Sequence, residues 1–251
     1  MKTYKRIGKT AMLVLLIFFL AVPLSLAADY SSKAVIAVNR ALNVEERMTA
    51  IFDLGASADE SAAPILLGIL RDTSEETRIR TSVVLALANL GTPRAQIIKA
   101  FESVYNELNN EKNFRYTILH SLGKMKAIES LSLFSTALSS KDSMIRLKAA
   151  QALGALENEY ALQLLAGHLA KEEDYMVRAA AVRAVGQSQT ATAEDILAKS
   201  LRSDPAPLVR NNAAIMLGKF KKLRPETQVA IEAAREDASP TVRNTVRGIQ
   251  P

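Results

Sequence analysis

Two histidines are the residues of this chain best suited to acid–base chemistry or metal binding. They are His120 and His168, and neither has a second His or a Cys at a metal-ligand spacing. Phosphate-binding glycine loops, nucleophile elbows and zinc motifs are missing from the sequence. Carboxylates cluster at 172–174, but this run falls at the expected start of a helix rather than in a pocket. We therefore predict no catalytic residue, no metal, no cofactor and no enzymatic activity.

Arginine recurs along the chain at a nearly constant interval. The clearest copies begin at Arg146, Arg178 and Arg210, which are 32 residues apart, and a glycine follows each of them eight residues later. The full series is Arg47, Arg80, Arg115, Arg146, Arg178, Arg210 and Arg243. A period of 20 to 50 residues is typical of a repeat architecture, in which each unit buries its apolar face against the next.

Each repeat has the pattern of two helices. Small or apolar residues lie three, four and seven positions after the arginine, as in Ala149, Ala150 and Leu153, and so share one helical face. We expect the glycine to end this first helix as a left-handed C-cap. A second apolar stripe follows, for example Ala161, Leu162 and Leu165. The sequence therefore predicts an all-α solenoid, a right-handed superhelix of about six full repeats plus a terminal half repeat.

The arginine series has two readings. Acidic residues lie four positions before several of its members, at helical spacing and near helix N-termini, as in Glu76, Glu111, Asp142 and Asp174. This favours a structural ladder of ion pairs between repeats together with helix caps, and Asn43 and Ser239 occupy further cap positions. The alternative is a row of cations that binds anions or phosphate.

The recurring Asp, Val-Arg, Ala-Ala and Ala-Leu-Gly pattern resembles the short HEAT-like repeats of the phycobilisome-lyase type, over residues 43–249. The resemblance implies an α-solenoid that holds another macromolecule, in a family that includes bilin-lyase subunits, scaffolds and a metal-dependent hydroxylase. The hydroxylases carry paired His-Glu dipeptides, whereas this chain has His120-Ser121 and His168-Leu169. A lyase role is also disfavoured, because bilin lyases act on cytoplasmic proteins, whereas residues 1–27 of this chain have the pattern of an export signal.

The first 27 residues have the pattern of a signal peptide. Four basic residues precede the apolar run 11–22, and small residues at Ser25 and Ala27 suit cleavage after Ala27. An uncleaved anchor is the alternative, but the apolar run is short for a membrane span and Pro23 interrupts it. We predict a mature solenoid of residues 28–251, exported to the periplasm in a Gram-negative cell, with no stable membrane insertion.

Charge outside this leader is nearly balanced. The whole chain has 32 Lys and Arg against 26 Asp and Glu, a net charge of +6, and four of the basic residues lie in the leader. Basic residues also gather in two turns, at Lys124 with Lys126 and at 219–224, where they are either solvated or dock an acidic partner. Two separate clusters do not form a nucleic-acid track, so we predict no nucleic-acid partner.

These features favour a non-catalytic scaffold or adaptor of the cell envelope that binds a protein or peptide. Polar positions of the second helices that escape the apolar stripe are the expected contacts: Gln163, His168, Asp195 and Lys199. An accessory subunit or chaperone of an exported enzyme, and an enzyme of the lyase or hydroxylase type, stay open as alternatives. Both ends of the array have features of a terminal cap. Arg247 occupies a position that is apolar in the internal repeats, and a helix over 31–42 is expected to cover the first repeat with Val35, Ile36 and Val38. These caps permit a monomer.

Overall fold

The structure, a computed structural model, describes residues 24–107 and 111–249. Within these ranges the chain is all-α and contains no β-strand. It divides into two units, unit 1 up to Leu90 and unit 2 from Gly91. Most of the predicted leader lies outside the described residues, so its cleavage stays a prediction. No helix in the described ranges combines the length and the apolar character that crossing a membrane requires.

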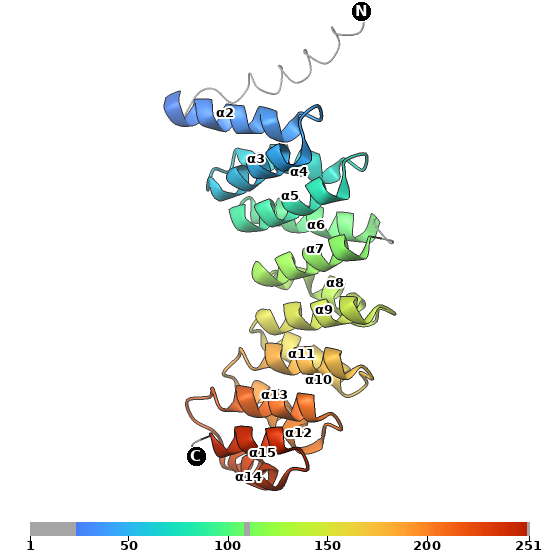
Figure 1. Cartoon of the computed structure of the whole chain (residues 1–251), viewed down its shortest axis with the longest axis vertical. Coiled ribbons are helices and arrows are strands. Elements are labelled where there is room, and N and C mark those ends of the chain that lie inside the picture. The colour runs from blue at the N-terminus through green and yellow to red at the C-terminus, as the bar shows by residue number, and fades with distance from the viewer. Residues whose placement is uncertain (1–23, 108–110, 250–251) are drawn as a thin grey trace, which may run out of the picture. The chain divides into compact units, whose positions relative to one another are not determined.

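The helices follow the predicted order of pairs (Figure 1). Unit 1 contains α2 (Leu24–Val38), α3 (Val44–Ala56), α4 (Ala62–Arg71) and α5 (Thr77–Leu90). Unit 2 contains α6 (Arg94–Glu107), α7 (Lys112–Lys124), the 3₁₀ turn η1 (Ile128–Ser130), α8 (Leu131–Leu138), α9 (Ser143–Ala155), α10 (Glu159–Leu169), α11 (Tyr175–Val185), α12 (Ala191–Ser203), α13 (Pro207–Leu217), α14 (Pro225–Ala233), the 3₁₀ turn η2 (Ala234–Glu236) and α15 (Pro240–Arg247). Among the described residues, six helix pairs follow one another in the sequence, from α3–α4 to α13–α14, and the single helix α15 comes after them, as predicted.

Two layers of helices make up unit 2. The first helices of the repeats, α7, α9, α11, α13 and α15, pack side by side in one layer, and α8, α10, α12 and α14 form the other. The layer of first helices lies in front in Figure 1. In unit 1, α2, α3 and α5 pack in succession and α4 packs against them. The predicted all-α solenoid is thus confirmed.

Small residues line the contacts between successive first helices. Ala149, Ala150, Ala181 and Ala214, which occupy the predicted positions, are fully buried. A side chain that stops at Cβ lets two helix axes approach towards the lower end of the usual range of about 8–10 Å. The predicted face of the first helices is therefore the one that packs between repeats.

The repeat glycines have another role than the one predicted. They do lie at equivalent places, at the end of each first helix, but Gly186 and Gly218 have right-handed φ values of −68° and −62°. The prediction of left-handed C-caps is wrong for these positions. A Cβ at Gly154 would lie 2.7 Å from the carbonyl carbon of Ala184, and one at Gly123 would lie 2.8 Å from Cα of Ala152. Glycine is required here because the next first helix approaches too closely for a side chain.

The predicted helix starts are mostly confirmed. The side chains of Asn43, Asp142 and Asp174 each accept hydrogen bonds from backbone N–H groups of the first helical turn. Ser239 precedes α15 but makes no such bond, and Pro240 occupies the first helical position as expected. Glu111 likewise precedes α7 without capping it by its side chain. Caps therefore mark some repeats of the array and not others.

The N-terminal covering helix buries different residues from those predicted. It is α2, which ends at Val38 rather than Leu42. Ala34 and Ala37 are buried, whereas Val35 and Val38 are 48% and 49% exposed. The reason is the same close packing, because α2 lies against α3 and only small residues fit between two helices at short distance.

Candidate functional site

The repeat arginines connect neighbouring repeats through hydrogen bonds. Arg146 donates from Nε and Nη2 to the two carboxylate oxygens of Glu172, at 2.8 and 2.9 Å. Arg178 and Arg210 bind Asp204 and Asp237 in the same bidentate manner, with distances between 2.7 and 3.0 Å. In unit 1, Arg47 donates to both oxygens of Glu75. Such two-pronged pairs are stronger and more directional than single contacts.

In unit 2, each linking acid also binds the next repeat arginine through its backbone carbonyl. Nη1 of Arg178 donates to the backbone carbonyl of Glu172 at 3.0 Å, while the carboxylate of Glu172 binds Arg146. The carbonyl of Asp204 accepts from Arg210 in the same way, at 2.9 Å. One residue in the loop between repeats therefore holds two successive first helices at a fixed spacing.

The electrostatics of these acids reflect their arginine partners. Burial by itself raises the pKa of Glu172, but the hydrogen bonds from Arg146 and from the Asp174 N–H, with His168 nearby, bring it down to about 2. The guanidinium of Arg210 likewise lowers the pKa of Asp237. Both acids thus stay ionised wherever the fold is intact at ordinary pH.

The ladder is interrupted at Arg115. The position equivalent to Glu172 and Asp204 is Ser140. Its carbonyl accepts a hydrogen bond from Arg146, and its hydroxyl accepts one from the Asp142 N–H. Serine, however, offers no carboxylate to Arg115. The Arg115 guanidinium lies instead over the ring of Tyr105, with 4.2 Å from Cζ to the ring centre. Its buried Nε has no hydrogen-bond partner among the described residues.

Four of the seven repeat arginines form the predicted ion pairs between repeats, but with other partners than the acids four residues upstream. The carboxylates that bind the arginines lie 26 to 28 residues downstream, in the next loop. Asp142 and Asp174 act as caps instead, and Asp142 also pairs with Lys112 at 2.9 Å. The guanidinium groups of four repeat arginines are occupied by these carboxylates, which favours the structural reading over anion binding.

The predicted contact residues lie on the second helices, and two of the four are part of links between repeats. His168 Nε2 lies 2.7 Å from Oε2 of Glu172, and Asp195 pairs with Arg224. Gln163 on α10 and Lys199 on α12 are exposed. The structure thus places the four residues along one layer without gathering them into a single pocket.

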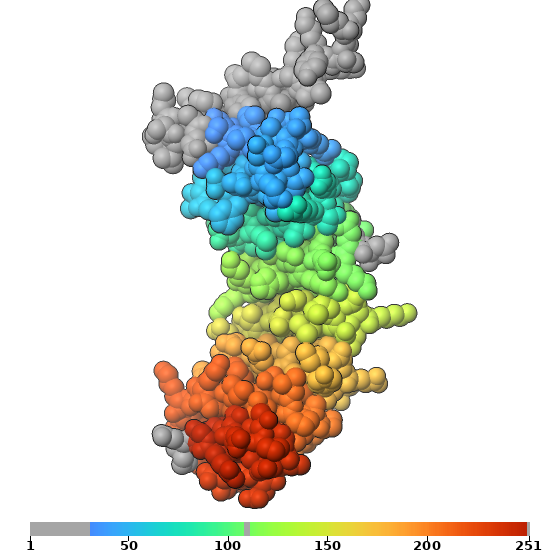
Figure 2. All heavy atoms as spheres, viewed as in Figure 1, coloured from blue at the N-terminus to red at the C-terminus, as the bar shows by residue number. Residues whose placement is uncertain are grey.

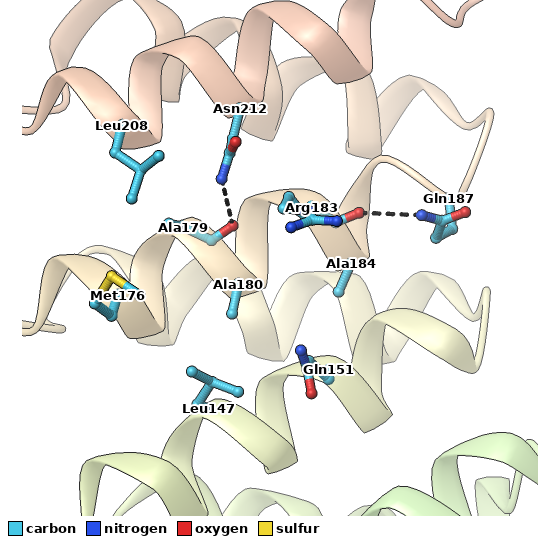
Figure 3. A pocket seen from close by; sticks show the side chains of 10 residues that line it. All are labelled: Leu147, Gln151, Met176, Ala179, Ala180, Arg183, Ala184, Gln187, Leu208 and Asn212. Atoms are coloured by element: carbon cyan, nitrogen blue, oxygen red, sulfur yellow. Dashed lines mark hydrogen bonds between the residues drawn. The ribbon is translucent and has the colours of Figure 1, made fainter.

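A groove opens on the other layer, across the first helices α9, α11 and α13 (Figure 3). It has a volume of about 500 Å³. Leu147, Met176 and Leu208 line it towards the N-terminal ends of the three helices. Gln151, Arg183, Gln187 and Asn212 line it towards the other end. The groove therefore combines an apolar half with a half that is rich in carboxamides.

Each of the three carboxamides of the groove makes one long hydrogen bond within the fold, and Gln151 accepts its bond from Lys148 at 3.5 Å. Asn212 donates to the Ala179 carbonyl at 3.3 Å, and Gln187 is 3.5 Å from the Arg183 carbonyl. Arg183 is the single charged lining residue; it is exposed, and no carboxylate in the described part of the chain pairs with it. In the space-filling view, the first helices of unit 2 face the reader, so the groove lies on the yellow-to-orange part of that surface (Figure 2). The sequence pattern placed the residues that line the groove on helices, and it gave no signal that they form a groove.

Two further observations concern chemistry. Across residues 24–107 and 111–249, no three His, Cys, Asp or Glu side chains come together in a group that could hold a metal ion. Of the basic turns, Lys126 pairs with Glu157 at 2.9 Å and Arg224 with Glu194 at 3.0 Å. These two cations are therefore neutralised within the fold, and His120 is an exposed residue of α7.

Comparison with known proteins agrees with this architecture. A family of HEAT repeats matches residues 101–186 and 168–249, which together exceed half of the chain. No curated protein matches the sequence. Among solved structures, an archaeal HEAT-like repeats protein from Thermococcus onnurineus NA1 is 14% identical with a TM-score of 0.50, over 91% of this chain and 97% of that one.

Two other solved structures are similar at low identity. A chain of the Pds5–Scc1 complex is 10% identical with a TM-score of 0.51, over 87% of this chain and 48% of that one. A chain of the CpcE and CpcF complex of phycocyanin lyase from Nostoc sp. PCC7120 is 19% identical with a TM-score of 0.48, over 88% and 94%. At these identities the likeness concerns the fold. The repeat pattern, the two layers of helices and the family match together show that this chain belongs to the HEAT repeat proteins.

Proposed function

We propose that this protein is a non-catalytic scaffold that holds a segment of a partner protein, and that the groove across α9, α11 and α13 is the binding site. The observation that carries the proposal is the groove itself, in which Leu147, Met176 and Leu208 offer apolar contact beside three carboxamides. Carboxamides donate and accept hydrogen bonds, as a peptide backbone does, so the groove suits an extended chain or the side of a helix.

The surroundings of the groove support a protein partner. Tyr175 and Met144 at its apolar end are 50% and 42% exposed, and Met176 and Leu208 in the groove are 49% and 42% exposed. Clustered exposed apolar side chains are typical of interaction surfaces, and methionine adapts its shape to a partner. The fold is compatible with this role, since a similar chain was solved in a complex of Pds5 with Scc1.

Export is the second part of the proposal. It is supported by the leader pattern in residues 1–27, and it places the scaffold in the cell envelope. Fractionation of cells together with N-terminal sequencing tests it. We expect a mature chain that begins at Ala28 in the envelope fraction, and a full-length chain in the cytosol contradicts export.

Site-specific photocrosslinking in the native cell tests the groove. A photoreactive amino acid replaces Gln187 or Gln151 in the groove, or Gln163 on the second-helix layer as the matched control, since all three glutamines are exposed. We expect one protein to crosslink from both groove positions and not from Gln163, with mass spectrometry giving its identity. A crosslink from Gln163 alone moves the site to the second helices, and no crosslink from either layer contradicts the scaffold function.

A further inference from the structure

Charge is separated between the two layers of unit 2. The first helices α7, α9, α11, α13 and α15 contain no Asp or Glu anywhere between their bounds. The second helices α10, α12 and α14 all contain acidic residues, namely Glu159, Glu194, Asp195, Glu226 and Glu232. Unit 1 is mixed, since its first helix α3 contains Glu45, Glu46 and Asp53, whereas α5 contains no Asp or Glu. Of the second helices, α8 also lacks Asp and Glu between its bounds, so the contrast between the two layers holds from α9 to α14.

The cations on this layer fall into two groups. The buried or half-buried repeat arginines Arg146, Arg178 and Arg210 are neutralised by the linking carboxylates. Arg183 and Lys148 are not, since neither pairs with a carboxylate in the part of the chain that the structure describes, and Lys148 donates instead to the amide oxygen of Gln151. Arg183 lines the groove, and Lys148 follows the lining residue Leu147. The groove thus has two cations beside it that no carboxylate of the described residues neutralises.

We propose that the segment held in the groove is acidic and amphipathic, with Asp or Glu next to large apolar residues. This inference rests on the proposed function and names the chemistry of its partner. A carboxylate of the segment binds the Arg183 guanidinium, which is suited to bidentate pairing. An adjacent Leu, Ile, Met or Phe side chain fills the apolar half between Leu147, Met176 and Leu208. Complementary charge then sets the orientation of the segment and the rate of its association.

A peptide fits this surface better than a nucleic acid does. Only two uncompensated cations lie at the groove, and half of its lining is aliphatic. Nucleic-acid surfaces present rows of Lys and Arg to successive phosphates and stack aromatic rings on bases. No aromatic residue lines this groove.

Selection from a displayed library of random 12-residue peptides tests the inference on the purified protein. The expected result is an enrichment of peptides with a net negative charge and at least one large apolar residue. The selected peptides should bind about tenfold more weakly to the Arg183→Glu variant, and less weakly to Arg183→Gln. Raising NaCl from 0.05 to 0.5 M should also weaken binding, because salt screens exposed charge pairs.

Arg202→Glu is the matched control, since Arg202 is an exposed arginine of α12 in the opposite layer. It should bind the selected peptides within about twofold of the original protein. The inference that the segment is acidic is overturned if the selected peptides have no excess of acidic residues, or if they bind the Arg183→Glu variant equally well. Either result still leaves the groove as a peptide-binding site. A library that yields no binder overturns both this inference and the proposed function. A single-stranded 20-nucleotide DNA that displaces the selected peptides overturns the choice of a protein segment.

Discussion

Glu172 accepts two hydrogen bonds from Arg146 on its carboxylate and one from Arg178 on its backbone carbonyl. The side chain of Glu172 is 2% exposed, so these bonds form away from bulk water. Bonds of this kind to a charged group contribute more than those between neutral groups, and an unpaired buried charge is costly. Glu172 therefore links α9, which contains Arg146, to α11, which contains Arg178.

Replacing Glu172 by Gln should destabilise the protein by about 2 kcal/mol, because a neutral amide leaves the half-buried Arg146 guanidinium without its counter-charge. Urea unfolding followed by circular dichroism at 222 nm measures this change. Glu173→Gln serves as the control, since the neighbouring Glu173 side chain is exposed. Equal midpoints for the two variants contradict the assignment of the link to Glu172.

Stability should fall in acid over the range that the pKa of Glu172 defines. Its folded pKa of about 2 lies below the ordinary value of 4.5, so the folded state holds fewer protons than the unfolded state between these values. The contribution of the carboxylate is complete above about pH 4.5 and is lost as the pH falls towards 2. Urea midpoints measured across this range should decline, and they should decline less steeply in Glu172→Gln. Parallel slopes would show that other acids control the acid response.

Introducing an acid at Ser140 should repair the interrupted ladder. Ser140 occupies the position of Asp204 and already makes the local backbone bonds of that position. Ser140→Asp should therefore offer Arg115 a carboxylate and raise stability by about 1 kcal/mol. The exposed neighbour Ser139 provides the control variant Ser139→Asp. A lower melting temperature for Ser140→Asp than for Ser139→Asp argues against this equivalence of positions.

Two glycines of neighbouring helices should respond in opposite directions to alanine. Gly154→Ala forces a methyl group against Ala184 of α11 and should cost about 1–3 kcal/mol. Gly167 in α10 has no atom within 4 Å of an added Cβ, so Gly167→Ala should stabilise the helix by about 0.5–1 kcal/mol. Thermal unfolding of both variants measures the difference. Stabilisation by both substitutions contradicts the close approach of α9 and α11.

The sequence predicts the repeat and its helices because their signals are local. The spacing from Arg146 to Gly154 recurs in other repeats, and a cap such as Asp142 acts within one helical turn. The acid that binds Arg146 could not be found in the same way, since Glu172 is 26 residues distant and nothing in its local pattern indicates which arginine it reaches. A bidentate partner depends on how two repeats stack.

The groove escaped prediction for a related physical reason. Its walls come from three helices, and Leu147, Met176 and Leu208 come together only when those helices are stacked. Sequence reasoning placed the contacts at polar positions of the second helices, such as Gln163, because exposed polarity is visible in one repeat alone. The role of Gly154 was misread likewise, since contact with Ala184 belongs to the neighbouring repeat.

The shared use of Glu172 and Asp204 has a consequence for how unit 2 comes apart. When the loop that contains Asp204 opens, Arg178 loses its carboxylate and Arg210 loses its carbonyl acceptor in the same event. Melting of one repeat thus removes support from both adjoining repeats, and nearest-neighbour coupling makes such an array unfold cooperatively. Between Arg115 and Ser140 no carboxylate links the two repeats, so the coupling is weaker there. When unit 2 unfolds partially, the repeats on either side of this position should therefore separate first.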